Sequence, residues 1–204
     1  MNCVDDQGTV EQVRMTLESV EATLAFGESV GHRLRAGDLV ILSGPLGAGK
    51  TTLTKGIAAG MGVSGRVTSP TFVIARVHRP RSAGQGATGR DSAGQDSTRR
   101  DARSVPLVHV DAYRLAGAVE LDDLDLDTDL AAAAVVVEWG EGVAEQLSAQ
   151  RLLIALDPLP DDSRTATLTP VGGAWFSRLS EIIAAGRATR ATGRQSTGTP
   201  DGPR

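Results

Sequence analysis

LVILSGPLGAGKTTLTKGIAAG, residues 39–60, is the stretch that decides the fold of this chain. Its first five residues (39–43) form a mostly apolar run that is too short for a helix and predicts a strand buried on both faces. Residues 52–59 favour a helix that ends at Gly60, a typical helix C-cap. Between them, residues 44–51 match the pattern G-x-x-x-x-G-K-[ST]. Strand, glycine-rich loop and helix therefore follow one another in the order of a phosphate-binding loop.

The residue types in this loop suit a nucleotide phosphate. Glycines allow backbone N–H groups to turn inward, and a helix that begins at Lys50 adds unpaired N–H groups and the positive end of its dipole. We expect Lys50 to bind the β- and γ-phosphates and the Thr51 hydroxyl to bind Mg²⁺. The alternative is a plain glycine turn, since a chain of this length matches the pattern by accident roughly once in a hundred cases. The predicted nucleotide-binding residues are Gly44, Pro45, Leu46, Gly47, Ala48, Gly49, Lys50, Thr51 and Thr52.

Length and composition indicate one cytoplasmic domain. A chain of 204 residues that is 40% hydrophobic can bury one α/β core. A single cysteine, Cys3, excludes an intramolecular disulfide and a cysteine-based zinc site. Because no apolar run approaches the length of a membrane span and no signal pattern opens the chain, we expect a cytoplasmic protein without a membrane partner.

Charge divides the chain into an acidic body and two basic segments. Residues 79–103 carry six Arg against three Asp, and residues 187–204 carry four Arg against one Asp. Each segment is therefore +3, and because the whole chain is −4, the remainder carries −10. An acidic body argues against a nucleic-acid groove on the folded domain, so contact with RNA would have to come from the two basic segments.

The patterning predicts a single α/β domain over residues 9–186, with a P-loop NTPase-type sheet and flanking helices. Residues 79–104 have alanine as their only aliphatic residue, so we interpret them as a disordered insertion, with a flexible N-terminus at 1–8 and a disordered tail at 187–204. Apart from 39–43, predicted strands are 10–17, 72–77, 106–111, 131–138, 151–156 and 164–170. Apart from the helix at 52–59, predicted helices are 19–34 with Ser19 as N-cap, 118–130, 142–147 and 174–185.

Two carboxylates stand where predicted strands end. Asp111 closes the strand at 106–111, and Glu138 closes the strand at 131–138. Ligands of open α/β sheets collect at the carboxyl ends of strands, and a phosphate-binding loop needs an acidic partner for Mg²⁺ on a neighbouring strand. Either residue alone could be a helix cap or a solvated strand end. We expect at least one of the two to serve the metal.

Four ordered motifs together resemble the TsaE (YjeE) family over about residues 15–170. They are GPLGAGKTT (44–52), TSPTF (68–72), HVDAYRL (109–115) and VEWGE (137–141). Members of that family are the ATPase component of the bacterial machinery that makes threonylcarbamoyladenosine at position 37 of tRNA. The resemblance implies a P-loop fold that binds and slowly hydrolyses ATP with Mg²⁺. It also implies action with the TsaB–TsaD heterodimer, so that tRNA is reached only through the complex.

The resemblance also implies roles for single residues. Asp111 and Glu138 would be the catalytic pair that binds the metal and activates water, with Thr51 as a further metal ligand. Trp139 is a candidate contact of the nucleotide or of a partner. Members usually carry proline where Gly140 stands, which predicts a less rigid loop here. The residues that resemble a switch loop are Thr68, Ser69, Pro70 and Thr71.

Two other readings of the loop remain open. A small-molecule kinase would share it but needs an acceptor site and an arginine-bearing lid, for which 79–104 is the only candidate. A nucleotide-gated binding module would bind ATP with negligible catalysis. A GTPase is excluded because the chain has no Asn-Lys-x-Asp base-recognition motif.

Overall fold

The computed structural model describes residues 12–193 apart from 64, 66, 69, 71–73, 81–104, 116–119, 122, 123 and 125. Its strands are β1 (Val13–Leu17), β2 (Leu39–Ser43), β3 (Ala75–His78), β4 (Leu107–Asp111), β5 (Ala134–Glu138), β6 (Arg151–Pro158) and β7 (Arg164–Val171). Its helices are α1 (Val20–Gly31), α2 (Lys50–Gly60), α4 (Leu126–Ala132) and α5 (Gly173–Gly193), with two short 3₁₀ helices, η3 (Ala112–Arg114) and η4 (Glu145–Leu147).

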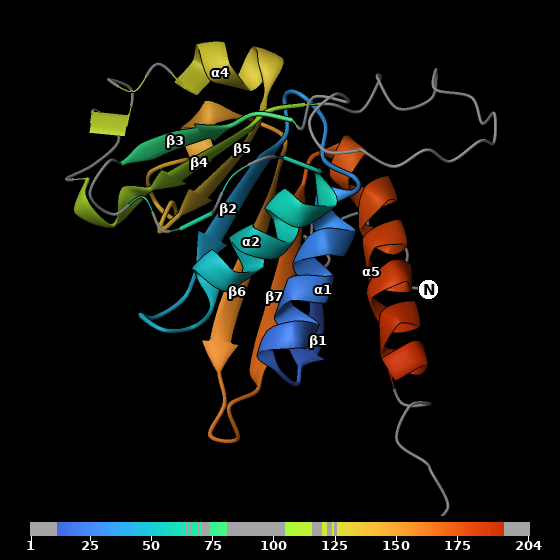
Figure 1. The fold of residues 1–204 in the computed structure, drawn as a ribbon. Helices are drawn as coiled ribbons and strands as arrows, with labels where there is room; N and C mark the ends of the chain where they lie inside the picture. The colour runs from blue at the N-terminus through green and yellow to red at the C-terminus, as the bar shows by residue number, and fades with distance from the viewer. Residues whose placement is uncertain are drawn as a thin grey trace, which may run out of the picture.

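The strands form one mixed seven-stranded sheet in the order β1-β7-β6-β2-β5-β4-β3 (Figure 1). The four central strands, β6, β2, β5 and β4, are parallel to their neighbours in this group. β7 and β1 add antiparallel strands at one edge and β3 adds one at the other. β2 therefore lies in the middle of the parallel group, and its carboxyl end adjoins that of β5.

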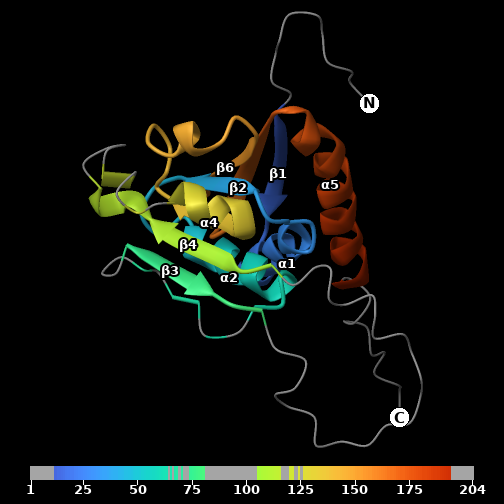
Figure 2. The same cartoon turned by 90° about the horizontal axis from the view of Figure 1, so that it is seen from above.

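Helices cover both faces of the sheet, which confirms the prediction of an α/β fold. α1, α2 and α5 pack on one face, around buried residues such as Phe26, Leu53 and Trp175. α4 packs on the other face, together with Leu121 from the segment before it. Figure 2 shows α1 and α2 side by side, with α5 beside α1. The apolar residues of β2 are fully buried because both faces of this strand are covered, as the sequence predicted.

α1 and α2 cross at an unusually short separation. A Cβ added to Gly27 would lie 2.9 Å from Gly56 Cα, and one added to Gly31 would collide with the carbonyl oxygen of Ile57. On the α2 side, a Cβ at Gly56 or Gly60 would collide with the backbone of α1. The two pairs of glycines, each four residues apart, therefore let the two backbones touch over two helical turns.

Several predicted boundaries were wrong. The strand predicted at 131–138 begins at Ala134, because the alanines at 131 and 132 continue α4. Alanine has the highest intrinsic helix propensity, so a run of alanines favours a helix wherever tertiary packing does not impose a strand. The helix predicted at 142–147 is only the single 3₁₀ turn η4. α1 ends at Gly31 rather than at 34, and Ser19 caps its other end as predicted by accepting a hydrogen bond from the N–H of Ala22.

The other differences lie at β3, at α5 and at the helix predicted at 118–130, where Leu124 lies in a turn and α4 covers only Leu126–Ala132. β3 begins at Ala75, because Ile74 has a φ of 68° that is incompatible with a strand, and residues 72 and 73 lie outside the described part. α5 continues past the predicted end at residue 185 to Gly193, so the first seven residues of the predicted tail are helical. The predicted N-terminal segment 1–8, residues 81–104 of the insertion and residues 194–204 of the tail lie outside the described residues.

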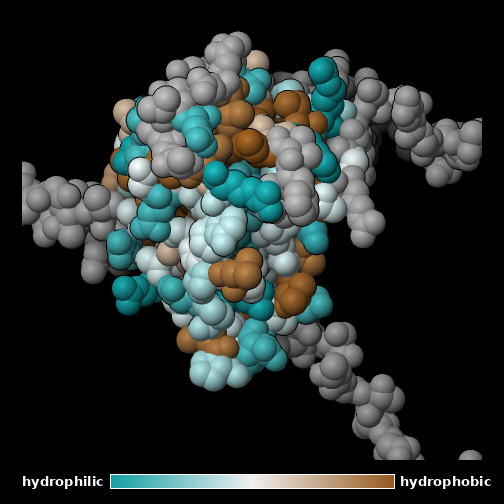
Figure 3. All heavy atoms as spheres, turned by 90° about the vertical axis from the view of Figure 1, so that its left-hand side faces the viewer, coloured by the Kyte–Doolittle hydropathy of each residue, from teal (hydrophilic) through white to brown (hydrophobic). Residues whose placement is uncertain are grey.

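Few large apolar side chains are exposed in the described part of the chain. The large hydrophobic residues that are exposed in the described part are Val20, Leu46, Val77, Tyr113 and Leu159. Figure 3 shows the side that lies on the left in Figure 1, where apolar patches are separated by polar ones. Among the described residues, no helix is both long enough and apolar enough to cross a membrane.

Candidate functional site

The glycine loop connects β2 to α2 through backbone conformations that favour glycine. Gly44 has a φ of 126°, and a Cβ there would collide with the carbonyl oxygen of Leu156 on β6. Gly49 is the N-cap of α2, with a φ of 104° and no side chain to cap the helix. The N–H groups of the first turn of α2 are therefore left without a side-chain cap, which is the arrangement that binds anions.

Lys50 is 4% exposed and bends back over the loop. Its Nζ donates to the carbonyl oxygens of Gly44 at 2.7 Å and Pro45 at 2.9 Å, and lies 3.5 Å from the centroid of the Trp139 ring. Burial lowers the pKa of the Lys50 ammonium, and the negative charges of Glu138 and Asp111 oppose this shift. The loop thus holds a desolvated cation beside the first turn of α2.

The two predicted carboxylates lie side by side. Asp111 on β4 and Glu138 on β5 are register partners in the parallel sheet, and Glu138 is in turn the partner of Leu42 on β2. Glu138 is 2% exposed, and its Oε2 accepts a hydrogen bond from the Thr51 hydroxyl at 2.9 Å. Asp111 is 4% exposed, and its Oδ1 accepts from the N–H of Tyr113 at 3.1 Å.

Two aromatic rings stand beside these carboxylates. Trp139 follows β5 with a φ of 62°, and its backbone N–H donates to the carbonyl oxygen of Leu42 at 2.9 Å. Its ring meets that of Tyr113 at 5.0 Å between centroids. The turn after Trp139 is held by the Gly140 carbonyl, which accepts hydrogen bonds from the N–H groups of Val143 and Ala144. A Cβ at Gly140 would lie 2.7 Å from a methyl group of Val137, so this turn has no room for a larger residue in its present form.

These groups line one pocket of about 450 Å³. Its lining residues are Leu46, Gly47, Gly49, Lys50, Thr51, Thr52, Asp111, Tyr113, Glu138 and Trp139. Of the predicted nucleotide-binding residues, Gly44, Pro45 and Ala48 are not in this lining, although the first two hold Lys50 through their carbonyl groups. The pocket therefore brings together both predicted carboxylates, Trp139 and most of the glycine loop.

The predicted switch loop does not line this pocket in the described residues. The Thr68 hydroxyl accepts a hydrogen bond from the Arg76 guanidinium at 3.2 Å, and the Pro70 carbonyl accepts from the N–H of Ile74 at 2.8 Å. Ser69 and Thr71 lie outside the described part. The role predicted for these four residues stays a prediction.

The sequence analysis missed three residues that belong to this site. Tyr113 lines the pocket, while Thr54 and His109 approach the carboxylate of Glu138 from behind it, at 3.3 Å and 2.7 Å from its Oε1. A signal existed for His109, because it stands two residues before Asp111 on a strand and so lies on the same face of the sheet. Thr54 lies one helical turn after Lys50 and Thr51, on the side of α2 that faces the sheet.

The donor set of the pocket suits Mg²⁺ held together with a phosphate. Thr51, Asp111 and Glu138 offer hard oxygen donors. In the described part of the chain, no group of three or more His, Cys, Asp or Glu residues could hold a metal ion without other ligands. Mg²⁺ is commonly bound by one or two carboxylates while phosphate oxygens and water complete its shell, and this pocket matches that pattern.

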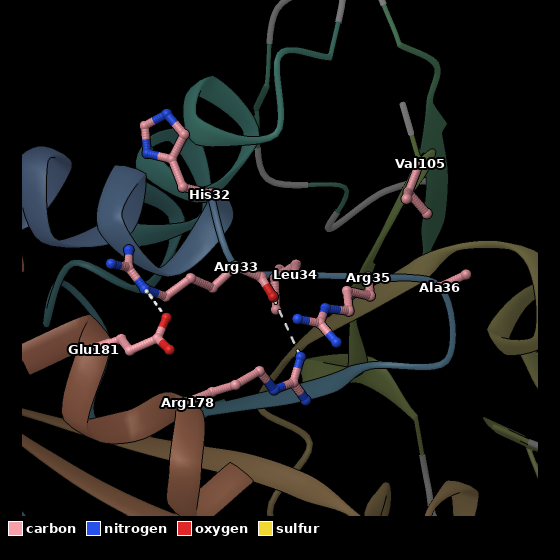
Figure 4. Close-up of a pocket in the computed structure, with 8 residues that line it drawn as sticks. All are labelled: His32, Arg33, Leu34, Arg35, Ala36, Val105, Arg178 and Glu181. Atoms are coloured by element: carbon pink, nitrogen blue, oxygen red, sulfur yellow. Dashed lines mark hydrogen bonds and ion pairs between the residues drawn. The ribbon is translucent and has the colours of Figure 1, made fainter. Parts of the chain in front are cut away.

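A second pocket, of about 870 Å³, lies where α1 leads into β2, at the opposite end of that strand from the glycine loop. Its lining includes Glu181 and three arginines, Arg33, Arg35 and Arg178 (Figure 4). The net negative charge of the chain conceals this local cluster of arginines. Arg33 pairs with Glu181 at 3.5 Å, and Arg178 forms two hydrogen bonds to Asp38, at 2.6 and 2.8 Å. We interpret this cluster as a clamp between α5 and the start of β2.

Comparisons with known proteins find a matching family, similar sequences and a similar crystal structure. The family described as "Threonylcarbamoyl adenosine biosynthesis protein TsaE" matches residues 17–166. The tRNA threonylcarbamoyladenosine biosynthesis protein TsaE of Mycobacterium tuberculosis is 51% identical over 159 residues, which cover 74% of this chain and 83% of that protein. The protein of the same name from Streptomyces coelicolor is 47% identical over 164 residues, covering 78% and 97%. The crystal structure of Bacillus subtilis YdiB superposes with a TM-score of 0.64 at 29% identity, covering 87% of this chain and 98% of that one.

Proposed function

The chain belongs to the TsaE family of threonylcarbamoyl adenosine biosynthesis proteins, and on this premise we propose that it binds and hydrolyses ATP with Mg²⁺ to support that modification of tRNA. One observation carries the ATPase part of the proposal. An uncapped helix N-terminus, a buried lysine and two neighbouring carboxylates line the same pocket. The P-loop NTPase-type sheet expected from the sequence is part of this proposal, since β2 leads into the glycine loop and lies beside β5, which carries Glu138, with β4 and its Asp111 next in the sheet.

Lys50 would exchange its present partners for phosphate oxygens. Its ammonium donates to two loop carbonyls, so a bound triphosphate would replace neutral acceptors with charged ones, which form stronger hydrogen bonds. The N–H groups at the start of α2 would add donors to the same phosphates. Gly47 has no neighbour within 4 Å of an added Cβ, which leaves the loop space to adjust around them.

We assign Glu138 to the metal and Asp111 to the attacking water. Glu138 accepts the hydrogen bond of Thr51, the residue whose hydroxyl is the expected metal ligand, so the two oxygens lie at the same point of the pocket. When bound, Mg²⁺ would neutralise charge on the phosphate oxygens during transfer. Asp111 lies one strand farther from the loop and can orient water as a general base.

The partners are proposed from the family resemblance, as the TsaB–TsaD heterodimer. Two exposed side chains at the rim of the pocket support a partner surface there. Leu46 is 87% exposed at the tip of the loop, and Tyr113 is 61% exposed beside Trp139. A partner that covered them would exclude water from the pocket, which strengthens the electrostatic contacts within it.

ATP turnover with and without TsaB–TsaD tests this function. We expect slow release of phosphate by the chain alone and faster release in the complex. The change of Glu138→Gln should reduce kcat by at least about 100-fold while ATP still binds, because a catalytic ligand is lost and the phosphate contacts remain. Asp111→Asn should reduce kcat to a similar extent.

The same assay separates the alternatives. ATP binding without turnover, alone and in the complex, would favour the nucleotide-gated binding module. Transfer of phosphate to a small molecule in place of water would favour the kinase. Normal turnover by both carboxylate variants in the complex would show that Asp111 and Glu138 are structural.

A further inference from the structure

His109 is a polar residue at a core position. It lies in the middle of β4, is fully buried, and its register partner on β5 is the apolar Val136. Side chains two apart on a strand share a face, so His109 points to the α2 side of the sheet, between Leu107 and Asp111. An imidazole buried at such a position loses its hydration, which destabilises the fold unless the ring gains a hydrogen-bond partner.

Its partner is the carboxylate of Glu138. His109 Nε2 lies 2.7 Å from Glu138 Oε1, the shortest contact that the structure gives to this carboxylate. The acceptor is a carboxylate oxygen, so Nε2 carries the hydrogen in this pair. His109 Nδ1 is buried and has no hydrogen-bond partner among the described residues, so Glu138 is the polar contact that the structure gives this ring.

Neither of the other two donors makes as short a contact with Oε1 as His109 does. The Thr51 hydroxyl donates to Oε2, on the pocket side of the carboxylate. The Thr54 hydroxyl lies 3.3 Å from Oε1, but it is closer, at 3.0 Å, to the carbonyl oxygen of Lys50. A hydroxyl has one hydrogen to donate, so Thr54 cannot serve both acceptors fully. Oε1 therefore depends on His109.

We propose that His109 is a positioning residue, which fixes the carboxylate of Glu138 so that Oε2 faces Thr51 and the expected metal. A carboxylate held at both oxygens keeps one orientation, whereas one held only by Thr51 can rotate about its terminal bond. His109 touches neither the pocket nor a substrate and acts only through Glu138. This inference rests on the proposed role of Glu138 and adds the residue that orients it.

Two substitutions separate hydrogen bonding from packing. His109→Gln keeps an N–H donor near the position of Nε2, whereas His109→Met fills a similar volume without a donor. In the TsaB–TsaD complex, His109→Met should lower kcat by roughly 10- to 100-fold, the usual loss for a partner that orients a metal ligand. The KM for ATP should stay within about 3-fold, because the phosphate contacts are intact, and His109→Gln should recover most of the lost kcat.

A double variant tests whether His109 acts through Glu138. In a Glu138→Gln background, His109→Met should cause no further loss of kcat, since the group it positions is already gone. An additional loss of full size would overturn the proposal. If Glu138→Gln itself leaves turnover unchanged, the proposed role of Glu138 fails. The spectroscopic measurement below then tests only whether His109 donates a hydrogen bond to Glu138.

Imidazole nuclear magnetic resonance gives a readout that does not depend on turnover. The chain has three histidines, so the single variants His32→Gln, His78→Gln and His109→Gln assign all ring signals. His109 should show the Nε2–H tautomer with a slowly exchanging ring proton. Glu138→Gln should move this proton signal, because a neutral amide is a weaker acceptor than a carboxylate.

The outcomes decide the proposal in either direction. Recovery by glutamine but not methionine, together with a ring signal that responds to Glu138→Gln, supports it. Equal kcat for His109→Met and the unaltered chain overturns it, as does an equal loss in both variants at matched melting temperature. A ring-proton signal of His109 that stays at the same chemical shift in Glu138→Gln also overturns the proposal.

Discussion

Lys50 allows a controlled test at the scale of one residue, because the chain has only one other lysine. That lysine, Lys55, lies exposed on the same helix. We expect Lys50→Ala to weaken ATP binding by about 2–3 kcal/mol, since a charge-assisted contact to phosphate is lost, and Lys55→Ala to leave it unchanged. Isothermal titration with ATP and Mg²⁺ measures both. Equal ATP affinities for the two variants would show that Lys50 does not bind the phosphates.

From the buried His78 we predict that the stability of the fold depends on pH in the mildly acid range. Burial lowers the pKa of this imidazole, with smaller contributions from His109 and Arg76. The unfolded chain, in which the pKa of histidine is about 6.5, therefore binds more protons than the folded chain at mildly acid pH. Stability is unaffected by this group above about pH 6.5 and falls as the pH drops toward the lowered pKa of the folded state.

Urea denaturation between pH 8 and pH 5 checks this prediction. The unaltered chain should lose more stability over this range than His78→Gln, because the variant has no group to protonate at this site. Carboxylates and the other histidines contribute to both curves, so only the difference between the curves is interpreted. Parallel curves would contradict the prediction.

At the scale of elements, the crossing of α1 and α2 reverses the usual effect of alanine. Alanine normally stabilises a helix relative to glycine by about 0.5–1 kcal/mol. At Gly31 its Cβ would collide with the backbone of α2, so we expect Gly31→Ala to destabilise the fold by about 1–3 kcal/mol. Gly173→Ala, at the start of α5 where an added Cβ meets nothing within 4 Å, is the matched control and should cause no loss. Thermal or urea unfolding of both variants measures the contrast.

Elements were predictable where local signals decide them. β2 is a short apolar run, and Ser19 is a typical N-cap, so both were found from sequence. The start of β5 was wrong because the alanines at 131 and 132 suit a helix or a buried strand, and only packing against the sheet decides between them. In the candidate site, Asp111 and Glu138 were found from their place at strand ends. His109 was missed because its role depends on a contact between two strands.

At the scale of the whole molecule, Arg178 and Asp38 join the C-terminal helix α5 to the start of the central strand β2. Their bidentate pair ties α5 to the residue before β2, and both side chains are about nine-tenths buried. We expect Arg178→Met to cost about 3–5 kcal/mol in unfolding free energy, because it leaves the buried Asp38 carboxylate without an opposite charge. Arg35→Met, in the same pocket, should change stability by less than about 0.5 kcal/mol, since its guanidinium has no partner among the described residues.

Urea denaturation of the single variants and of Arg178→Met with Asp38→Asn completes the test. The double variant should be more stable than the sum of the single losses predicts, because the unpaired charge is removed with its partner. ATP binding should be unchanged in Arg35→Met, which lies at the far end of β2 from the glycine loop. If the stability losses of the two single variants add up to that of the double variant, Arg178 and Asp38 have no interaction energy with each other.

Sheet order and the cationic cluster were beyond sequence analysis for the same reason. The sequence predicted the strands but not that β2 lies between β5 and β6, because strand order depends on contacts across the whole chain. The acidic total of the body concealed the cluster of Arg33, Arg35 and Arg178, because Arg178 is far from the other two in sequence and reaches them only when α5 packs beside α1. A sum of charges gives no information about where they gather.

The glycine contact between α1 and α2 also decides which walls of the pocket can move. Two backbones in contact over two turns behave as one rigid body, so α2 and the side chains of Lys50 and Thr51 that it carries have a stationary base. We therefore expect any rearrangement on nucleotide entry to fall on the glycine loop ahead of α2 and on Trp139, which directly follows β5 and is itself in a left-handed conformation. We therefore expect the α2 side of the pocket to stay in place when a ligand binds, while the glycine loop and Trp139 adjust to the ligand.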